Sequence, residues 1–338
     1  MSSAVLYYGL TILVYFACNV LMAMGLTVQF GWAGILNFCY YILVAIGGYV
    51  GALMAIGPVP PGQGNVVEYI GGWTLPWPVP VVGAGLVGAA LAVLICVVAV
   101  RRLQSDYLAI GTLVMGEIAW FLAGNTTAVV NGWNGLTGVP QPLVNLLNLP
   151  PLQYEEAFAA IALAIAALGF LILSRLQVSP FGRALRAMRE NEGTAAACGK
   201  DVFALRLRAM IVGGVFAAVG GALFIEFIGS ISPYLWDVPE TFVLFAALIV
   251  GGNGNRWGTV LGAGLVPVAF LEATRFVPAI DNNPATIAAL RWVVIGLLVI
   301  LMLLFRPQGV LPEPKGLVRE RAPQALQAEG AAASAVDA

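Results

Sequence analysis

Apolar stretches long enough to cross a membrane alternate with short polar segments along most of the chain. Each stretch has roughly twenty residues, the length that an α-helix needs to cross a hydrocarbon core about 30 Å thick. We therefore expect an all-α, polytopic integral membrane bundle with about eight to ten transmembrane helices. The range reflects two segments, because 240–252 is short and 26–40 is polar and glycine-containing enough to be a broken or re-entrant piece. The expected spans are 4–26, 33–57, 79–100, 107–130, 155–176, 206–229, 240–252, 258–278 and 285–305.

Basic residues are concentrated in a few of the polar segments. Arg101 is the first of them, and seven of the sixteen lie between Arg175 and Arg208. The segments 58–78 and 131–154, in contrast, contain no Lys or Arg. Cytoplasmic loops of membrane proteins carry the excess of these two residues. The alternation of basic and non-basic loops therefore predicts a cytoplasmic C-terminus and, for nine crossings, an N-terminus on the outside.

Composition supports a membrane protein rather than a soluble one. Hydrophobic residues make up 60% of the chain and charged residues only 10%, against about 25% charged in an ordinary soluble domain. We expect a transmembrane permease-type domain over 1–312, followed by a disordered cytoplasmic tail over the alanine-rich segment 313–338.

The residues needed for most catalytic and metal chemistry are missing from the sequence. It contains no His, and its four Cys are scattered without a CxxC pair. This excludes His-based metal sites and acid–base catalysis by His. We expect no catalytic residues, no metal, no cofactor bound by this chain and no nucleic-acid partner.

A basic, amphipathic helix is expected at the start of the segment 182–200. Phe181, Leu185 and Met188 form an apolar stripe at helical spacing. One interpretation is a positively charged cytoplasmic loop that lies near lipid headgroups. The basic stripe beside the apolar one consists of Arg183, Arg186 and Arg189.

A short turn of small side chains follows this helix. Thr194 can cap a single helical turn over 195–198, and Gly199 then ends it. Such a turn presents backbone and little bulk, which suits a peg that fits a groove on another protein. The second interpretation of the loop is therefore a docking element.

Ionisable residues within the expected spans need partners, because a charge at membrane depth is costly. Glu117 and Glu226 each lie well inside a span. They are either proton relays of a secondary transporter or polar links between helices. Glu272 and Arg275 lie at i and i+3 on one helix and are expected to form a structural pair.

Two glycine-rich segments are candidates for ordered turns. GGNGNRWG at 251–258 lacks the GK[ST] ending of a phosphate-binding loop, so we expect a tight turn between two helices. NGWNGLTGVPQP at 131–142 predicts an ordered outer loop, which is either an ordinary connection or a structured lid.

Five motifs occur in an order that resembles a known family of transporters. Together they resemble the permease subunits of ATP-binding-cassette importers for branched-chain amino acids, and most closely the larger of the two paired permeases. The similarity extends over about 26–312. The motifs are DYLAIGTLVMGEI (106–118), NGLTGVP (134–140), GRALRAMRENE (182–192), VGGNGNRWGTVLGA (250–263) and LFRPQGVL (304–311).

The resemblance implies a multi-pass protein of the bacterial inner membrane that works in a complex. Its partners would be a homologous second permease, two cytoplasmic ATPase subunits that use ATP and Mg²⁺, and an extracytoplasmic substrate-binding protein. The loop at about 177–205 would carry the coupling helix that fits a groove on the ATPase, although Asn191, Gly193 and Ala196 depart from the usual family pattern. The residues implied for this coupling loop are Arg183, Arg186, Arg189, Glu190, Glu192, Ala195, Ala196 and Gly199.

Substrate identity is less constrained by the resemblance. In GWAGILNFCYY at 31–41, Asn37 and Phe38 replace a small Gly and a polar His or Gln of the family. Branched-chain or other hydrophobic amino acids are the expected cargo, and urea, short amides or other small polar solutes are alternatives. A self-sufficient proton-coupled transporter is a further alternative. The polar residues expected near the substrate path are Asn37, Glu117, Asn134 and Thr137.

Overall fold

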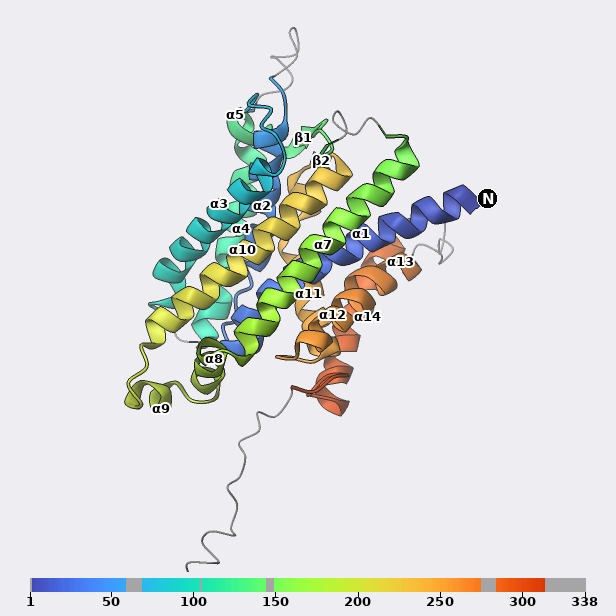
Figure 1. Ribbon diagram of the computed structural model, residues 1–338. Coiled ribbons are helices and arrows are strands. Elements are labelled where there is room, and N and C mark those ends of the chain that lie inside the picture. Colours follow the sequence, from blue (N-terminus) through green and yellow to red (C-terminus); the bar gives the residue numbers. More distant parts are fainter. Residues whose placement is uncertain (1, 59–68, 104, 144–148, 275–283, 314–338) are drawn as a thin grey trace, which may run out of the picture.

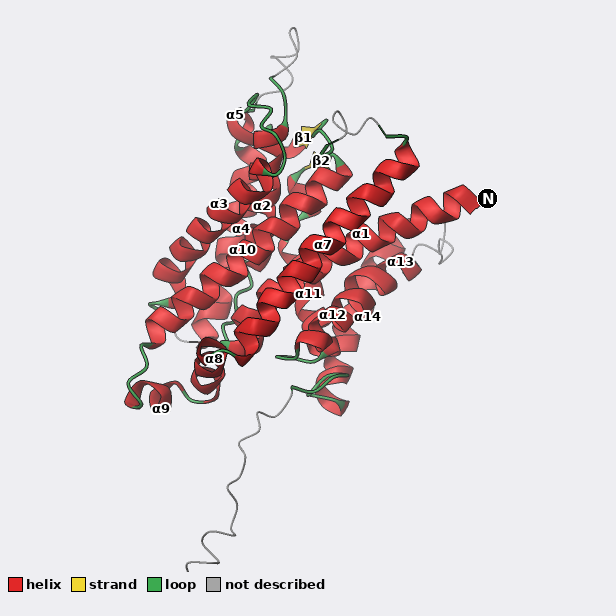
Figure 2. Cartoon of the chain, in the orientation of Figure 1, coloured by secondary structure: helices red, strands yellow, loops and turns green. Residues whose placement is uncertain are grey.

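The protein is a bundle of long helices, among which α3, α10 and α7 run in a similar diagonal direction (Figure 1). The computed structural model describes residues 2–58, 69–103, 105–143, 149–274 and 284–313. Helices make up almost all of the regular structure in these residues (Figure 2). The longer helices are α1 (Ser2–Leu26), α2 (Tyr40–Ala55), α3 (Val79–Ile95), α4 (Ser105–Asn125), α7 (Pro151–Val178), α10 (Val202–Ile228), α11 (Val238–Gly251), α12 (Arg256–Gly264) and α14 (Pro284–Phe305).

Shorter elements lie mainly at the two ends of the bundle. Figure 1 places helices α8 and α9 at one end, which we call the α9 end, and strands β1 and β2 at the opposite end, which we call the hairpin end. Three π-helical stretches continue longer helices, at Thr27–Trp32, Cys96–Val100 and Leu265–Phe270. The short elements are α5 (Thr127–Val130), α8 (Pro180–Glu190), α9 (Glu192–Ala197), α13 (Leu271–Ala273), β1 (Leu136–Thr137), β2 (Ser230–Ile231) and the 3₁₀ turns Gly132–Asn134 and Pro233–Leu235.

The expected polytopic membrane bundle is confirmed. Among the described residues, six helices are long and apolar enough to cross a membrane, and two shorter apolar helices lie at Tyr40–Ala55 and Ala289–Phe305. The described part of the remaining expected span 258–278 corresponds to α12, the π-helical stretch after it and α13, and 275–278 lie outside the described residues. The chain is therefore a multi-pass membrane protein.

The segment after α1 is broken, as its polar and glycine-containing sequence predicts. The chain leaves the π-helical stretch at Trp32 and does not become helical again until Tyr40, so the expected span 33–57 begins later than its apolar pattern indicates. Most of the intervening residues are nevertheless buried. Irregular backbone at membrane depth is tolerated where protein surrounds it.

Glycines allow α2 and α10 to pack backbone against backbone. A Cβ atom added at Gly47 would collide with the backbone of Ala218, and one added at Gly221 would collide with the carbonyl of Val44. Close approach of this kind is typical of membrane helices that meet through small residues at a spacing of four. Gly47 and Gly221 therefore permit the close approach of α2 and α10.

The loop at 131–142 is ordered, as its turn residues predict. Strand β1 pairs antiparallel with β2, with Leu136 opposite Ile231. The ring of Trp133 lies 4.7 Å from that of Trp120 and 5.3 Å from that of Tyr234, measured between centroids. These contacts fix the loop against α4 and the segment that follows β2.

Candidate functional site

Helix α8 is built by a capping residue and by its apolar stripe. The hydroxyl of Ser179 accepts a hydrogen bond from the backbone N–H of Gly182, and Pro180 occupies the first helical position. Leu185 and Met188 are buried against the body of the bundle. The amphipathic helix expected from the sequence is therefore confirmed.

Two of the three arginines on α8 are partly buried and pair with groups of the protein itself. Arg189 donates one hydrogen bond to the carbonyl of Gly31 and forms a 2.6 Å ion pair with Glu313. Arg186 lies 3.7 Å from the same carboxylate and donates a 2.7 Å hydrogen bond to the carbonyl of Gln177. The two side chains are less than a third exposed because the chain folds back over them.

Arg183 differs from these two residues. It is exposed, and its guanidinium donates a 2.8 Å hydrogen bond to the carbonyl of Val178. Only this arginine of the stripe is directed mainly to solvent.

Helix α9 begins earlier than the sequence predicts. The side chain of Asn191, not that of Thr194, caps it by accepting a 2.8 Å hydrogen bond from the Thr194 N–H. The expectation for the other end is confirmed, because Gly199 has a φ of +75° and the backbone turns out of the helix there. Ala195 is buried, and Ala196 is exposed.

The α8–α9 segment is also tied to the long helix that follows it. Glu192 and Arg206 form a 2.6 Å ion pair, and the carboxylate of Asp201 accepts a 2.9 Å hydrogen bond from the N–H of Ala204 at the start of α10. Glu190 is exposed on the last turn of α8. The ion pair therefore connects α9 directly to α10.

The GGNGNRWG segment is the tight helix–helix turn that its composition predicts, and it packs on the break after α1. The indole N–H of Trp32 donates a 3.1 Å hydrogen bond to the carbonyl of Gly254. The segment that follows α14 completes the cluster, since the N–H of Leu311 donates a 3.0 Å hydrogen bond to the carbonyl of Gly251. The break after α1, the turn 251–258, the segment after α14 and α8 are distant in the sequence and thus meet at the α9 end.

Asn37 lies in the break and is fully buried. Its amide donates a 2.9 Å hydrogen bond to Gln29, which in turn donates a 3.2 Å hydrogen bond to the carbonyl of Met210 in α10. The amide oxygen of Asn37 accepts from the thiol of Cys39. In this structure Asn37 connects the break to α10 and does not line either of the polar cavities described below.

The other three residues expected near the substrate path lie outside the lining of both cavities. Glu117 is exposed on α4. Asn134 and Thr137 are exposed at the hairpin end, in and beside β1. Their role in the path stays a prediction.

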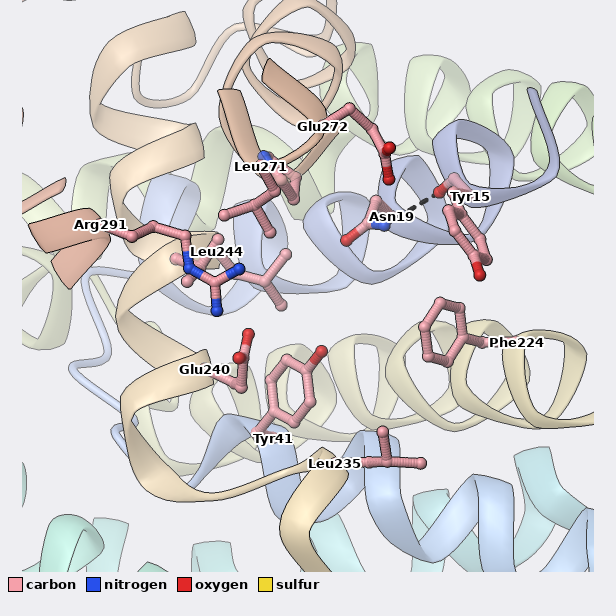
Figure 3. Close-up of a pocket in the computed structure, with 12 residues that line it drawn as sticks. Tyr15, Asn19, Tyr41, Phe224, Leu235, Glu240, Leu244, Leu271, Glu272 and Arg291 are labelled. Atoms are coloured by element: carbon pink, nitrogen blue, oxygen red, sulfur yellow. Dashed lines mark hydrogen bonds between the residues drawn. The ribbon is translucent and has the colours of Figure 1, made fainter. Parts of the chain in front are cut away.

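A polar cavity of about 320 Å³ lies between α1, α2, α10, α11, α13 and α14 (Figure 3). The guanidinium of Arg291 and the carboxylate of Glu240 point toward one another, whereas Glu272 points toward Asn19 and Tyr15 (Figure 3). The carboxylate of Glu272 accepts a 2.7 Å hydrogen bond from the hydroxyl of Tyr8. Its expected partner, Arg275, lies outside the described residues. The polar lining residues are Tyr15, Asn19, Tyr41, Glu240, Glu272 and Arg291.

Sequence reasoning did not select this cavity. Glu240 and Arg291 belong to different helices, and no local spacing relates them. The only available signal was that each is an ionisable residue within an expected span, which by itself marks a functional candidate.

A second cavity, of about 360 Å³, opens near the hairpin end. It is lined by the segments 74–77 and 138–143 and by Glu226, which is only 1% exposed. Neither carboxylate oxygen of Glu226 has a hydrogen-bond partner among the described residues. Its role as a proton relay or as a polar link between helices therefore stays a prediction.

Comparison with known families shows which family the chain belongs to. The family described as "Branched-chain amino acid transport system / permease component" matches residues 8–303. The chain belongs to this family. The relatives that the comparison finds are transport permeases, not catalytic enzymes.

The chain is similar to individual relatives over most of the length of each relative. The chain is 30% identical to the high-affinity branched-chain amino acid transport system permease protein LivM of Salmonella typhimurium, over 90% of this chain and 70% of that protein. It is 28% identical to the probable LivM permease of Methanocaldococcus jannaschii, over 89% and 92%. A permease named LivH from Escherichia coli is 26% identical, over 87% and 91%. No solved structure matches the chain.

Proposed function

We propose that this permease is one membrane-spanning subunit of an ATP-driven importer of branched-chain amino acids. In this proposal the α9 end faces the cytoplasm of a bacterial cell and α9 docks on an ATPase subunit that binds and hydrolyses ATP with Mg²⁺. A second permease and an extracytoplasmic binding protein complete the complex. The chain would alternate between inward- and outward-facing packings of its helices, biased by the ATPases.

The ion-pair cluster around Arg189 carries this proposal. Arg189 connects α8 to the carbonyl of Gly31, in the π-helical stretch that continues α1, and to Glu313, which follows α14. Coupling between distant sites travels through contiguous packed and hydrogen-bonded elements. A force on α9 would therefore reach the ends of two membrane helices through one guanidinium.

The proposed cargo is supported by the cavity of Figure 3. It combines a cationic side chain and two carboxylates with apolar neighbours such as Phe224 and Leu244. A zwitterionic, hydrophobic amino acid has a carboxylate that complements the cationic side chain, an ammonium group that complements the carboxylates and an apolar side chain that complements the apolar neighbours. Urea is uncharged, so the cavity favours amino acids over the urea and short-amide alternative.

Pairing with a second permease is supported by the outer face of α4. Glu117 is exposed there, beside Val114 and Ile118, which are 48% and 54% exposed, and one turn from Phe121. A carboxylate that faces lipid is unfavourable by about 2.5 to 3.5 kcal/mol at the centre of a helix. We therefore place the second permease against this face, where it can provide a hydrogen-bond partner for Glu117.

Replacing Glu117 with lysine is expected to reduce co-purification of the second permease by about tenfold, because a partner that accommodates a carboxylate would meet an ammonium group. Glu156→Lys is the matched control, because Glu156 is an exposed carboxylate on α7. Tagged chains are co-expressed with the other subunits, and the recovered permease is quantified by mass spectrometry. Equal recovery with both variants would show that the second permease binds elsewhere.

Docking of the ATPase is tested at the exposed side of α9. Ala196→Trp adds bulk where the proposed groove must close around the helix, so the ATPase subunits should be lost from the purified complex. Leu304→Trp adds the same side chain at a 71% exposed position near the end of α14 and should retain them. The docking proposal fails if the ATPases co-purify equally with both variants.

A further inference from the structure

The cavity of Figure 3 contains opposite charges that face each other without a direct ion pair. Glu240 lies on α11 and Arg291 on α14, and no salt bridge joins them in the part of the chain that the structure describes. The Nε atom of Arg291 is buried and has no hydrogen-bond partner among the described residues. Charged groups away from water are stable only with good partners, so a ligand with both charges would complete this site.

The remaining lining suits a small amphipathic ligand. Asn19 donates its amide N–H to the carbonyl of Tyr15, so its amide oxygen is available as an acceptor. The hydroxyl of Tyr41 points into the space beside the carboxylate of Glu240 (Figure 3). Apolar side chains cover the walls, among them Phe224 and Leu244. A volume of about 320 Å³ lies at the lower end of the range for small-molecule pockets.

We propose that this cavity is a substrate-binding site, in which Arg291 binds the carboxylate of an α-amino acid and Glu240 binds its ammonium group. The apolar wall receives the side chain. This assignment rests on the proposed import function and adds to it the residues that bind the two charged groups of the amino acid. Arg is suited to the carboxylate because its planar donors match both carboxylate oxygens.

The competing explanation is a structural pair whose charges merely balance each other. In that case neutralising both residues together would restore the protein in every respect, because well-packed neutral groups often replace an internal ion pair without loss. A binding site behaves differently. The double neutral variant would be stable and would still fail to bind the substrate.

Binding is measured on the full chain in lipid nanodiscs, without ATP, ATPase or binding protein, by saturation-transfer NMR. The probes are L-leucine, isoamylamine, which lacks the carboxylate, isocaproate, which lacks the ammonium group, and urea. Wild-type protein should bind L-leucine about tenfold more tightly than either single-charge analogue. Urea should not compete.

The variants separate the two charges. Glu240→Gln should weaken the affinity for L-leucine and for isoamylamine by about tenfold and leave the affinity for isocaproate unchanged. Arg291→Gln should weaken the affinity for L-leucine and for isocaproate and leave the affinity for isoamylamine unchanged. Glu226→Gln, a buried carboxylate of the other cavity, should leave all probes unchanged. The double variant Glu240→Gln with Arg291→Gln should melt at the wild-type temperature and fail to bind L-leucine.

Wild-type L-leucine affinity in Glu240→Gln or in the double variant would overturn the site, as would competition by urea. Because the assay contains no ATPase, failure of ATP-driven uptake would refute the proposed function and not this binding result. Conversely, ATP-driven uptake with unaltered L-leucine affinity in Glu240→Gln would refute only the site.

Discussion

Replacement of Arg189 by glutamine is expected to reduce ATP-driven uptake by about tenfold or more while the ATPase subunits remain bound and active. The guanidinium is the only group in the described residues that joins α8 to both the carbonyl of Gly31 and the carboxylate of Glu313. Glutamine cannot make both contacts, so motion of α8 would no longer reach the break after α1. Uptake and ATP hydrolysis are measured on the same proteoliposomes.

Arg208→Gln provides the control for the loss of a positive charge near this end of the protein. Arg208 is exposed on the first turns of α10. The Arg208→Gln variant should retain the wild-type ratio of uptake to ATP hydrolysis. Glu313→Gln should resemble Arg189→Gln, and the double variant should be no worse than either single one, because the two residues act through one contact. Unchanged uptake in Arg189→Gln would contradict the role of this cluster.

Replacement of Gly47 by leucine is expected to prevent formation of a stable bundle. A side chain at this position collides with the backbone of Ala218, and backbone cannot rotate away as a side chain can. Overpacking a core costs about 3 kcal/mol in the more severe cases. We therefore expect aggregation on size-exclusion chromatography and a melting temperature well below that of the wild type.

Gly296→Leu is the matched control, because a Cβ atom there has no neighbour within 4 Å. Both substitutions replace helical glycine with a better helix former, so they gain similarly in helix propensity. Only the variant at Gly47 should aggregate. Equal stability of the two variants would show that α2 and α10 are not packed as closely as described.

Local patterns in the sequence predict local structure well in this protein. The spacing of Leu185 and Met188 predicts the buried stripe of α8, and Gly199 predicts the end of α9, since both depend on neighbours a few residues away. The cap of α9 was predicted wrongly because Asn191 and Thr194 can both accept a backbone hydrogen bond. Asn191 does so, and it lengthens the helix toward its start.

Contacts between distant segments could not be predicted from these patterns. The basic stripe of α8 indicates charge but not that Glu313 and the carbonyl of Gly31 lie against it. In the same way, nothing in the sequence near Glu240 indicates that it faces Arg291 across a cavity (Figure 3). Such pairs depend on how whole helices pack, and periodicity within one helix carries no information about that.

The central claim is that ATP hydrolysis by partner subunits drives transport through this permease. It is tested most directly by uptake of labelled L-leucine into proteoliposomes that contain the complete complex, with its binding protein supplied on the side of the hairpin end. We expect uptake that requires ATP on the side of α9 and is abolished when the ATPases are omitted. Uptake by the chain alone, driven by a pH gradient and lost in Glu117→Gln or Glu226→Gln, would contradict it.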